Sequence, residues 1–238
     1  MERIDDLGIN NLKIIQNTEG FRFGIDSVLL TEFARDIKKG SKIADFGSGT
    51  GILGILLTAK VNPAEVILFE KQKEVAEMSK KSIELNKLEK LVSVENVDVK
   101  DIGNKNSYFD VVVTNPPYKK QGTGIDSKLE KHHISRFETS CSLYDWICKA
   151  SKVLKSKGAF YIVYRADRLQ ELANELKTNK LEIKRMRFVY SNIESQSNLV
   201  LIKAIRGAGE FLKVEKPLII YNEDGSYTDE IKEIYKEK

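Results

Sequence analysis

The sequence has few cysteines, no strong excess of charge and no long apolar run. Its two cysteines, Cys141 and Cys148, match neither the spacing of a zinc site nor a disulfide framework, so we expect buried or idle thiols. No segment approaches the roughly 18 apolar residues that a membrane-spanning helix needs, and the opening residues Met1–Asp6 do not read as a signal sequence. We therefore expect a cytoplasmic protein without a membrane segment, either a monomer or a weak homodimer.

Charge is weak overall but uneven along the chain. Lys and Arg exceed Asp and Glu by 39 to 35, a net charge of +4 that by itself indicates no class of partner. Residues 119–157, however, hold 9 basic and 4 acidic residues. The adjacent pair His132 and His133 lacks the carboxylates or cysteines of a metal site, so we expect surface residues or phosphate contacts and no metal.

With 238 residues and 41% hydrophobic side chains, the chain is long enough for a sizeable core. We find no repeat, low-complexity segment or linker, which favours one domain over residues 1–238. We divide it into an N-terminal arm and helix (1–40), a core (41–206) and a C-terminal extension (207–238).

Strands and helices alternate through the core. The pattern predicts strands at 42–46, 65–69, 91–94, 109–114, 158–164, 181–190 and 198–205, with helices at 52–57, 72–86, 143–154 and 168–177. This alternation predicts an α/β fold with a mostly parallel sheet covered by helices on both faces. In the helix over 72–86, the predicted inner stripe is Val75, Met78, Ser82, Ile83 and Leu85.

Both ends of the chain add smaller elements. A hairpin is predicted from Leu12–Asn17 and Phe21–Gly24, with its turn near Glu19. A helix then starts with Asp26 or Ser27 as its N-cap, although Asp26 is as well suited to contact a ligand. After residue 206 the tail carries an apolar stretch at 217–221, and we expect a short charged helix near 227–235.

A glycine-rich turn, Gly47-Ser48-Gly49-Thr50-Gly51, follows the strand that ends Asp45-Phe46 and precedes a helix. Glycines allow a sharp turn and a close approach of backbone to ligand. The turn lacks the spacing of the dinucleotide fingerprint and the lysine of a phosphate-binding loop. Alone it is equally consistent with a tight connection.

Acidic residues follow the next two strands. Glu70 ends the second strand, where a carboxylate can accept both hydroxyls of a ribose. After the third strand come Asp98 and Asp101. Either could accept from an adenine amino group, and we favour Asp98.

The fourth strand ends in Asn115-Pro116-Pro117-Tyr118. The two prolines fix two φ angles and remove two backbone donors, while their carbonyls remain acceptors. A stiff corner that only accepts hydrogen bonds is suited to hold N–H groups. If the first and fourth strands are neighbours, this corner faces the glycine turn, because ligands on such sheets bind at the carboxyl ends of strands.

In combination these motifs resemble the class I S-adenosylmethionine-dependent methyltransferases, over about residues 20–205. The four-residue corner resembles that of enzymes that methylate planar nitrogens. The lead-in Phe21–Leu30 and the ending Pro217–Asn222 resemble those of one bacterial branch of the family. The enzymes of this branch are adenine-N6 methyltransferases that act beside the anticodon of a valine tRNA.

The resemblance implies seven core strands in the order 3-2-1-4-5-7-6, with the seventh antiparallel. It also implies S-adenosylmethionine as cofactor, with the methionine carboxylate near Asp45, Gly47 and the N-terminal lead-in. The cofactor-binding residues that we predict are Gly24, Asp26, Asp45, Gly47, Ser48, Gly49, Gly51, Glu70 and Asp98. The predicted catalytic residues are Asn115, Pro116, Pro117 and Tyr118.

The chemistry needs a reoriented amine rather than a strong base, because an adenine amino group delocalises its lone pair into the ring. The Asn115 oxygen and Pro116 carbonyl would accept its two N–H groups, and Tyr118 would stack on the flipped base. Phosphates of a tRNA would meet the basic residues Lys119, Lys120, Lys131, His132 and Arg136. A second basic cluster, Lys184, Arg185 and Arg187, is equally consistent with a solvated strand face.

Similar corners occur in enzymes that act on other substrates: DNA adenine, guanine N2 of ribosomal RNA, and a glutamine of release factors. The chain has no room for the recognition domain of large DNA methyltransferases. The glutamine enzymes usually carry a helical N-terminal domain, whereas only about forty residues precede the first core strand here. The ribosomal substrate remains open. A catalytically inactive RNA-binding module is a further alternative, but such a module need not keep Asn115 and Tyr118.

Overall fold

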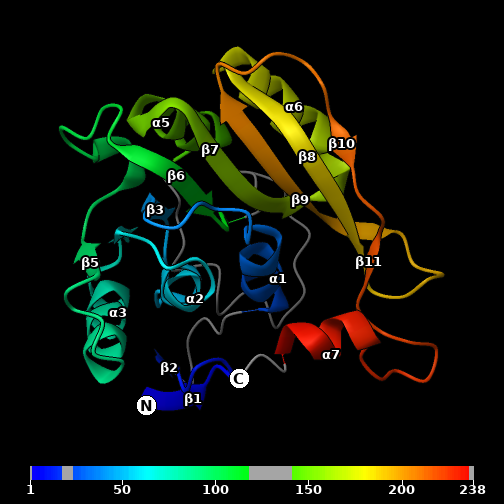
Figure 1. Ribbon diagram of the computed structural model, residues 1–238, viewed down its shortest axis with the longest axis horizontal. Helices are drawn as coiled ribbons and strands as arrows, with labels where there is room; N and C mark the ends of the chain where they lie inside the picture. The colour runs from blue at the N-terminus through cyan, green and yellow to red at the C-terminus, as the bar shows by residue number, and fades with distance from the viewer. Residues whose placement is uncertain (1, 18–23, 118–140, 236–238) are drawn as a thin grey trace.

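The apolar, β-branched runs of the sequence form one central sheet. The computed structural model describes residues 2–17, 24–117 and 141–235 (Figure 1). The core strands are β3 (Lys42–Phe46), β4 (Glu65–Phe69), β5 (Val92–Glu95), β6 (Phe109–Thr114), β7 (Leu154–Arg165), β8 (Leu181–Tyr190) and β9 (Ser197–Arg206). Their bounds confirm the predicted strands closely, and only β7 begins clearly earlier than predicted.

The hydrogen-bonded order of these strands is β5, β4, β3, β6, β7, β9, β8. Strand β9 is antiparallel to both neighbours, and the other pairings are parallel. The predicted order and the antiparallel seventh strand are therefore confirmed. Because the parallel strands share one direction, the carboxyl ends of β3, β4, β6, β7 and β8 lie at the same edge, which we call the carboxyl edge.

Helices cover both faces of the sheet, as predicted (Figure 1). On one face lie α1 (Ile25–Phe33), α2 (Ile52–Val61) and α3 (Lys73–Leu85), which share an apolar cluster with the sheet. On the other lie α5 (Leu143–Val153) and α6 (Leu169–Thr178), with their own cluster. Short 3₁₀ turns, η1 (Val99–Asp101) and η2 (Ala166–Arg168), follow β5 and β7.

The N-terminal residues form a hairpin that the sequence did not predict. It pairs β1 (Glu2–Asp6) with β2 (Lys13–Asn17), with its turn between residues 6 and 13. Residues 18–23, which hold the rest of the predicted hairpin, lie outside the described residues. The hairpin docks on α3, where the Asn86 side chain accepts from the Lys13 N–H and donates to the Lys13 carbonyl at 2.8 and 2.6 Å.

The C-terminal segment extends the sheet at its β8 edge. Strands β10 (Lys213–Val214) and β11 (Leu218–Ile219) both pair in parallel with β8, and α7 (Asp229–Tyr235) follows. In Figure 1, α7 lies beside α1. The division into one domain with an arm, a core and an extension stays a prediction.

Candidate functional site

The glycine turn and the Asn-Pro-Pro corner lie side by side at the carboxyl edge. Strands β3 and β6 are parallel neighbours with Phe46 opposite Thr114, so both turns begin at the same level. The Thr114 hydroxyl donates to the Phe46 carbonyl at 3.0 Å and ties the two strand ends together. The expectation that these turns face each other is thus confirmed.

The glycine turn depends on a backbone that other residues avoid. Gly47, Gly49 and Gly51 have φ of +60°, +56° and +90°, in the left-handed region. The Gly49 carbonyl accepts from the Ser79 hydroxyl of α3 at 2.7 Å. A Cβ on Gly49 would meet nothing within 4 Å, whereas one on Gly47 would lie 2.3 Å from the Trp146 ring. Space for a ligand therefore opens beside Gly49.

Polar atoms of the turn are buried yet unpaired among the described residues. They are Asp45 Oδ1, Ser48 Oγ and Thr50 Oγ1. The other Asp45 oxygen accepts from the Gly54 N–H at 3.1 Å. Burial raises the pKa of Asp45 well above its usual value, the Gly54 bond partly opposes this, and the charge of Glu70 raises it further. Because buried polar groups are rarely left unpaired, these three atoms suit a polar ligand.

Glu70 directly follows β4 and is 6% exposed. Its two oxygens accept from the Gly49 and Gln72 N–H groups at 3.0 and 2.8 Å. Burial raises the pKa of Glu70, and these backbone bonds oppose the shift. An ionised carboxylate has about four acceptor positions, and the Lys71 N–H also bonds this one. Glu70 therefore keeps an acceptor position for a hydroxyl group beside the turn.

Asp98 and Asp101 lie in different surroundings. Asp98 is half-buried, its carboxylate accepts from the Lys100 N–H at 3.2 Å, and it pairs with Lys71 at 3.1 Å. Asp101 is exposed. The thiol of Cys141 is half-buried, and burial together with the nearby Asp98 raises its pKa to about 12. The two carboxylates therefore differ in burial, and the preference for Asp98 stays a prediction.

The corner after β6 connects to the start of α1. The Asn115 side-chain N–H donates to the buried Ser27 hydroxyl at 3.3 Å, Pro116 is buried and Pro117 is exposed. The N-cap of α1 is the exposed Gly24, without a side-chain cap bond, so the prediction of Asp26 or Ser27 as N-cap is wrong. Asp26 instead lies in the first turn, one residue before Ser27.

Part of the predicted site lies outside the described residues: Tyr118, Lys119, Lys120, Lys131, His132 and Arg136. Sequence reasoning in turn missed three residues, Ser27, Ser79 and Trp146, which contact the predicted ones. Serine in an apolar helical stripe, at positions 27 and 79, was the available signal. Within the described ranges, no group of three or more His, Cys, Asp or Glu side chains could hold a metal ion.

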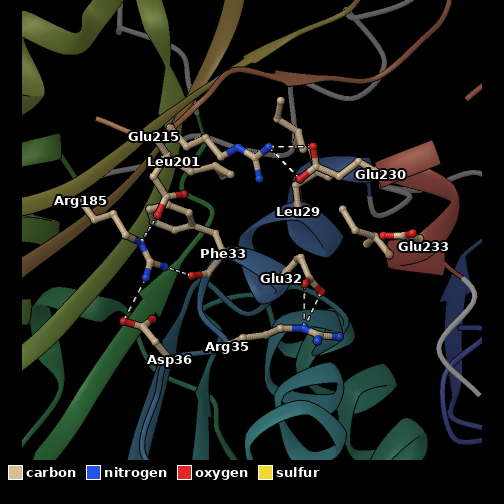
Figure 2. Close-up of a pocket in the computed structure, with 13 residues that line it drawn as sticks. Leu29, Glu32, Phe33, Arg35, Asp36, Arg185, Leu201, Glu215, Glu230 and Glu233 are labelled. Atoms are coloured by element: carbon tan, nitrogen blue, oxygen red, sulfur yellow. Dashed lines mark hydrogen bonds and ion pairs between the residues drawn. The ribbon is translucent and has the colours of Figure 1, made fainter. Parts of the chain in front are cut away.

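A separate cavity of about 410 Å³ lies between α1, β8, β9 and the C-terminal segment (Figure 2). Arg185 pairs there with Asp36 at 3.1 Å and Glu215 at 3.2 Å, and Arg187 pairs with Glu230 at 2.7 Å. No predicted site residue lines this cavity. Its arginines join elements within the molecule, so the basic cluster on β8 is no free phosphate-binding surface.

The described helices include none with the length and apolar character to cross a membrane.

Comparison with known proteins identifies a class of enzyme. The model of the methyltransferase small domain matches residues 24–189. A tRNA1(Val) (adenine(37)-N6)-methyltransferase of Haemophilus influenzae is 25% identical over 228 residues, which cover 94% of each chain. The enzyme of the same name from Porphyromonas gingivalis is 27% identical over 191 residues, covering 76% of this chain and 73% of that one.

Solved structures share the fold. A predicted O-methyltransferase from Agrobacterium tumefaciens has a TM-score of 0.70 at 22% identity, over 89% of this chain and 97% of the other. TYW2 from Pyrococcus horikoshii, solved in complex with MeSAdo, has a TM-score of 0.62 at 15% identity, over 87% and 72%. These matches confirm the predicted fold and the prediction of an S-adenosylmethionine-dependent methyltransferase. The chain belongs to the methyltransferase small domain family.

Proposed function

We propose that this protein transfers a methyl group from S-adenosylmethionine to the exocyclic N6 of an adenine in tRNA, in the anticodon loop of a valine tRNA. One observation carries the proposal: Asn115 lies at the end of β6, directly beside the glycine turn of β3. An acceptor for an amino group and a cofactor turn therefore share one edge. The names of the relatives support tRNA as the substrate.

The residues of the turn fit this cofactor. Glu70 would accept the ribose hydroxyls, and Asp98 would accept from the adenine amino group. Asp45 Oδ1, buried and unpaired among the described residues, is an acceptor for a cationic group. Since Asp45 is itself a carboxylate, we assign it to the ammonium of the methionine part rather than to the carboxylate. Gly47, Ser48, Gly49 and Gly51 would form the wall, and Gly24 and Asp26 the N-terminal side.

Asn115 and Pro116 would orient the target amine. The Asn115 oxygen and the Pro116 carbonyl accept its two N–H groups, which turns the nitrogen lone pair away from the ring. S-adenosylmethionine supplies an electrophilic methyl group on its sulfonium. The two acceptors then stabilise positive charge on the nitrogen, whose proton leaves to water after transfer. Such positioning contributes up to about 7 kcal/mol, and Tyr118 would stack on the base.

The function is tested by incubating the purified protein with S-adenosylmethionine and total tRNA, followed by nucleoside mass spectrometry. We expect N6-methyladenosine as the product. A methylated guanine, or transfer to protein glutamine instead, would contradict the substrate. Binding of tRNA without binding or turnover of the cofactor would leave only an RNA-binding module.

The mechanism is tested by Asn115→Ala. We expect kcat to fall about 100-fold or more, as for loss of one preorganised polar group, while the Kd of the cofactor changes less than about threefold. Asn104→Ala, at an exposed asparagine in the loop before β6, is the matched control. Turnover by Asn115→Ala close to that of the control would contradict the role of Asn115.

We further propose that the protein acts in the cytoplasm, where tRNA is modified, as a monomer or weak homodimer without a metal. Lys119, Lys120, Lys131, His132 and Arg136 would contact the phosphates of the tRNA. Charge supports this assignment, because the surplus of basic residues falls on the segment directly after the corner.

A further inference from the structure

Three tyrosines of the C-terminal segment form a stack at the carboxyl edge. The Tyr221 and Tyr227 rings lie 5.3 Å apart at 14°, and the Tyr227 and Tyr235 rings 5.9 Å apart at 20°. Tyr227 therefore lies between the other two, and one face of Tyr221 is left at the end of the stack. Tyr221 is 39% exposed, so part of its ring is accessible to a partner.

The stack extends outward from the proposed site. Burial raises the pKa of its inner ring, Tyr235, to about 12, and Tyr227, Tyr221 and the Asp26 carboxylate add to the shift. Asp26 precedes Ser27, which contacts Asn115. Figure 1 shows α7, which ends with Tyr235, beside α1. The stack thus begins near the start of α1 and ends at Tyr221.

A pocket of about 610 Å³ lies against Tyr221. The β8–β9 loop supplies Ile193, an isoleucine that is 62% exposed. The turn after β11 supplies Asn222, Glu223 and Asp224. The pocket therefore has an aromatic face, an apolar side chain and carboxylate acceptors, and its volume exceeds that of a nucleobase.

We propose that this pocket binds a nucleobase of the RNA substrate other than the methylated adenine, stacked on Tyr221. The proposal rests on the proposed function and names a second contact of the same substrate. A flat base extends a stack of near-parallel rings, and unpaired RNA bases bind proteins in this way. The carboxylates match the amino groups of adenine, guanine or cytosine.

The charges of the pocket determine how the RNA approaches. Glu223 and Asp224 disfavour a nearby phosphate, so the base enters while its backbone stays outside. The contact is therefore one of stacking, and it differs from the phosphate contacts proposed for Lys119 and its neighbours. Stacking adds affinity without releasing counterions, so it leaves the salt dependence of binding unchanged.

The test measures KM for tRNA in the full-length protein over a range of salt concentrations. We expect Tyr221→Ala to raise KM about tenfold at every salt concentration. The slope of log KM against log salt, kcat and the Kd of S-adenosylmethionine stay unchanged. Tyr221→Phe keeps the ring and should stay within about twofold of the wild type.

Phe211→Ala is the matched control. Phe211 is 80% exposed and follows β9, whose antiparallel direction places it at the opposite edge of the sheet. We expect no change in its KM. An unchanged KM for Tyr221→Ala, or a changed salt slope, would overturn the proposal. Absence of methyl transfer by the wild type would instead contradict the proposed function.

Discussion

At the scale of single residues, Asp45 stands out because its carboxyl group is fully buried and one of its oxygens has no partner among the described residues. Burying an ionised group without compensation costs several kcal/mol. The raised pKa of Asp45 reflects this cost. A bound cationic group would compensate the buried carboxylate, which agrees with the proposed contact between Asp45 and a cationic part of the cofactor.

Asp45→Asn should therefore stabilise the free protein and weaken cofactor binding. The folded-state pKa of Asp45 lies above its unfolded value of about 4. The stability that the protonated carboxyl group contributes is fully present below the unfolded pKa and is lost as pH rises through the folded pKa. We expect the Tm of Asp45→Asn to exceed that of the wild type at pH 8 and to match it near pH 4.

Thermal unfolding across this pH range measures the first effect, and titration calorimetry measures the second. Loss of a charge-assisted hydrogen bond should weaken S-adenosylmethionine binding about 10- to 100-fold at pH 8. A lower Tm than the wild type at pH 8 would show that the ionised carboxylate stabilises the free protein, contrary to this account.

Residues next to strand ends were predictable because the position of a motif along the chain fixes its place at the carboxyl edge. Asn115 and the glycine turn belong to this group, whereas the preference for Asp98 over Asp101 stays a prediction. For Ser27 and Trp146, the sequence does not identify the residue that each side chain contacts. Each meets its partner across a large sequence separation, and nothing in the local pattern of a helix specifies what its buried face will touch.

At the scale of elements, α3 shows where pattern reasoning fails. The predicted inner stripe included Leu85, which is 41% exposed. The buried face carries Ser82, as predicted, and also Ser79, which the predicted stripe left out. The Ser79 hydroxyl donates to the Gly49 carbonyl, and the Ser82 hydroxyl accepts from the Ile15 N–H. An apolar stripe predicts burial against other apolar groups. Here part of the helix packs on exposed backbone of the glycine turn and the hairpin, and backbone requires polar partners.

Helix α5 packs against the glycine turn through Trp146, which predicts unequal effects of two alanine substitutions. Gly47→Ala and Gly49→Ala both place a side chain at positive φ, which costs roughly 1–2 kcal/mol. Only Gly47→Ala adds a contact at 2.3 Å with the Trp146 ring. We expect it to lower the free energy of unfolding by about 1–3 kcal/mol more than Gly49→Ala does.

Urea unfolding followed by the fluorescence of Trp146, the single tryptophan, measures both variants. The double variant Gly47→Ala/Trp146→Phe replaces the indole ring with a smaller phenyl ring. It should recover part of the free energy of unfolding that Gly47→Ala loses relative to Gly49→Ala, with circular dichroism as the readout. Equal losses in the two single variants would mean that the ring moves aside without cost.

At the scale of the whole molecule, some basic side chains form ion pairs within the protein, and others are proposed to bind the RNA. Arg185 and Arg187 on β8 are taken up by ion pairs with Asp36, Glu215 and Glu230. Lys71 is paired with Asp98. A surplus of basic residues falls on residues 119–157, directly after the proposed base corner. Within this segment, Lys155 is paired with Asp110 at 2.7 Å.

Changing Lys119, Lys120 and Lys131 together to Glu should therefore raise KM for tRNA and flatten its salt dependence. Each lost phosphate contact lowers the slope of log K against log salt by about 0.7–0.9. The matched control reverses Lys38, Lys39 and Lys90, exposed lysines in the segments before β3 and β5 at the opposite edge. If both triple variants change the slope equally, the effect is one of net charge and the RNA binds elsewhere.

The neighbouring positions of β3 and β6 also have a consequence for biosynthesis. The bond from Thr114 to Phe46 spans 68 residues, so the site has no local nucleus, and β3 waits for a partner made much later. At roughly 5–20 residues per second, a ribosome leaves one side of β3 uncovered for several seconds. During that interval the nascent chain presents an apolar strand edge, the feature most prone to pair with other chains. The arrangement that builds the site thus makes the growing polypeptide most dependent on chaperones before β6 emerges.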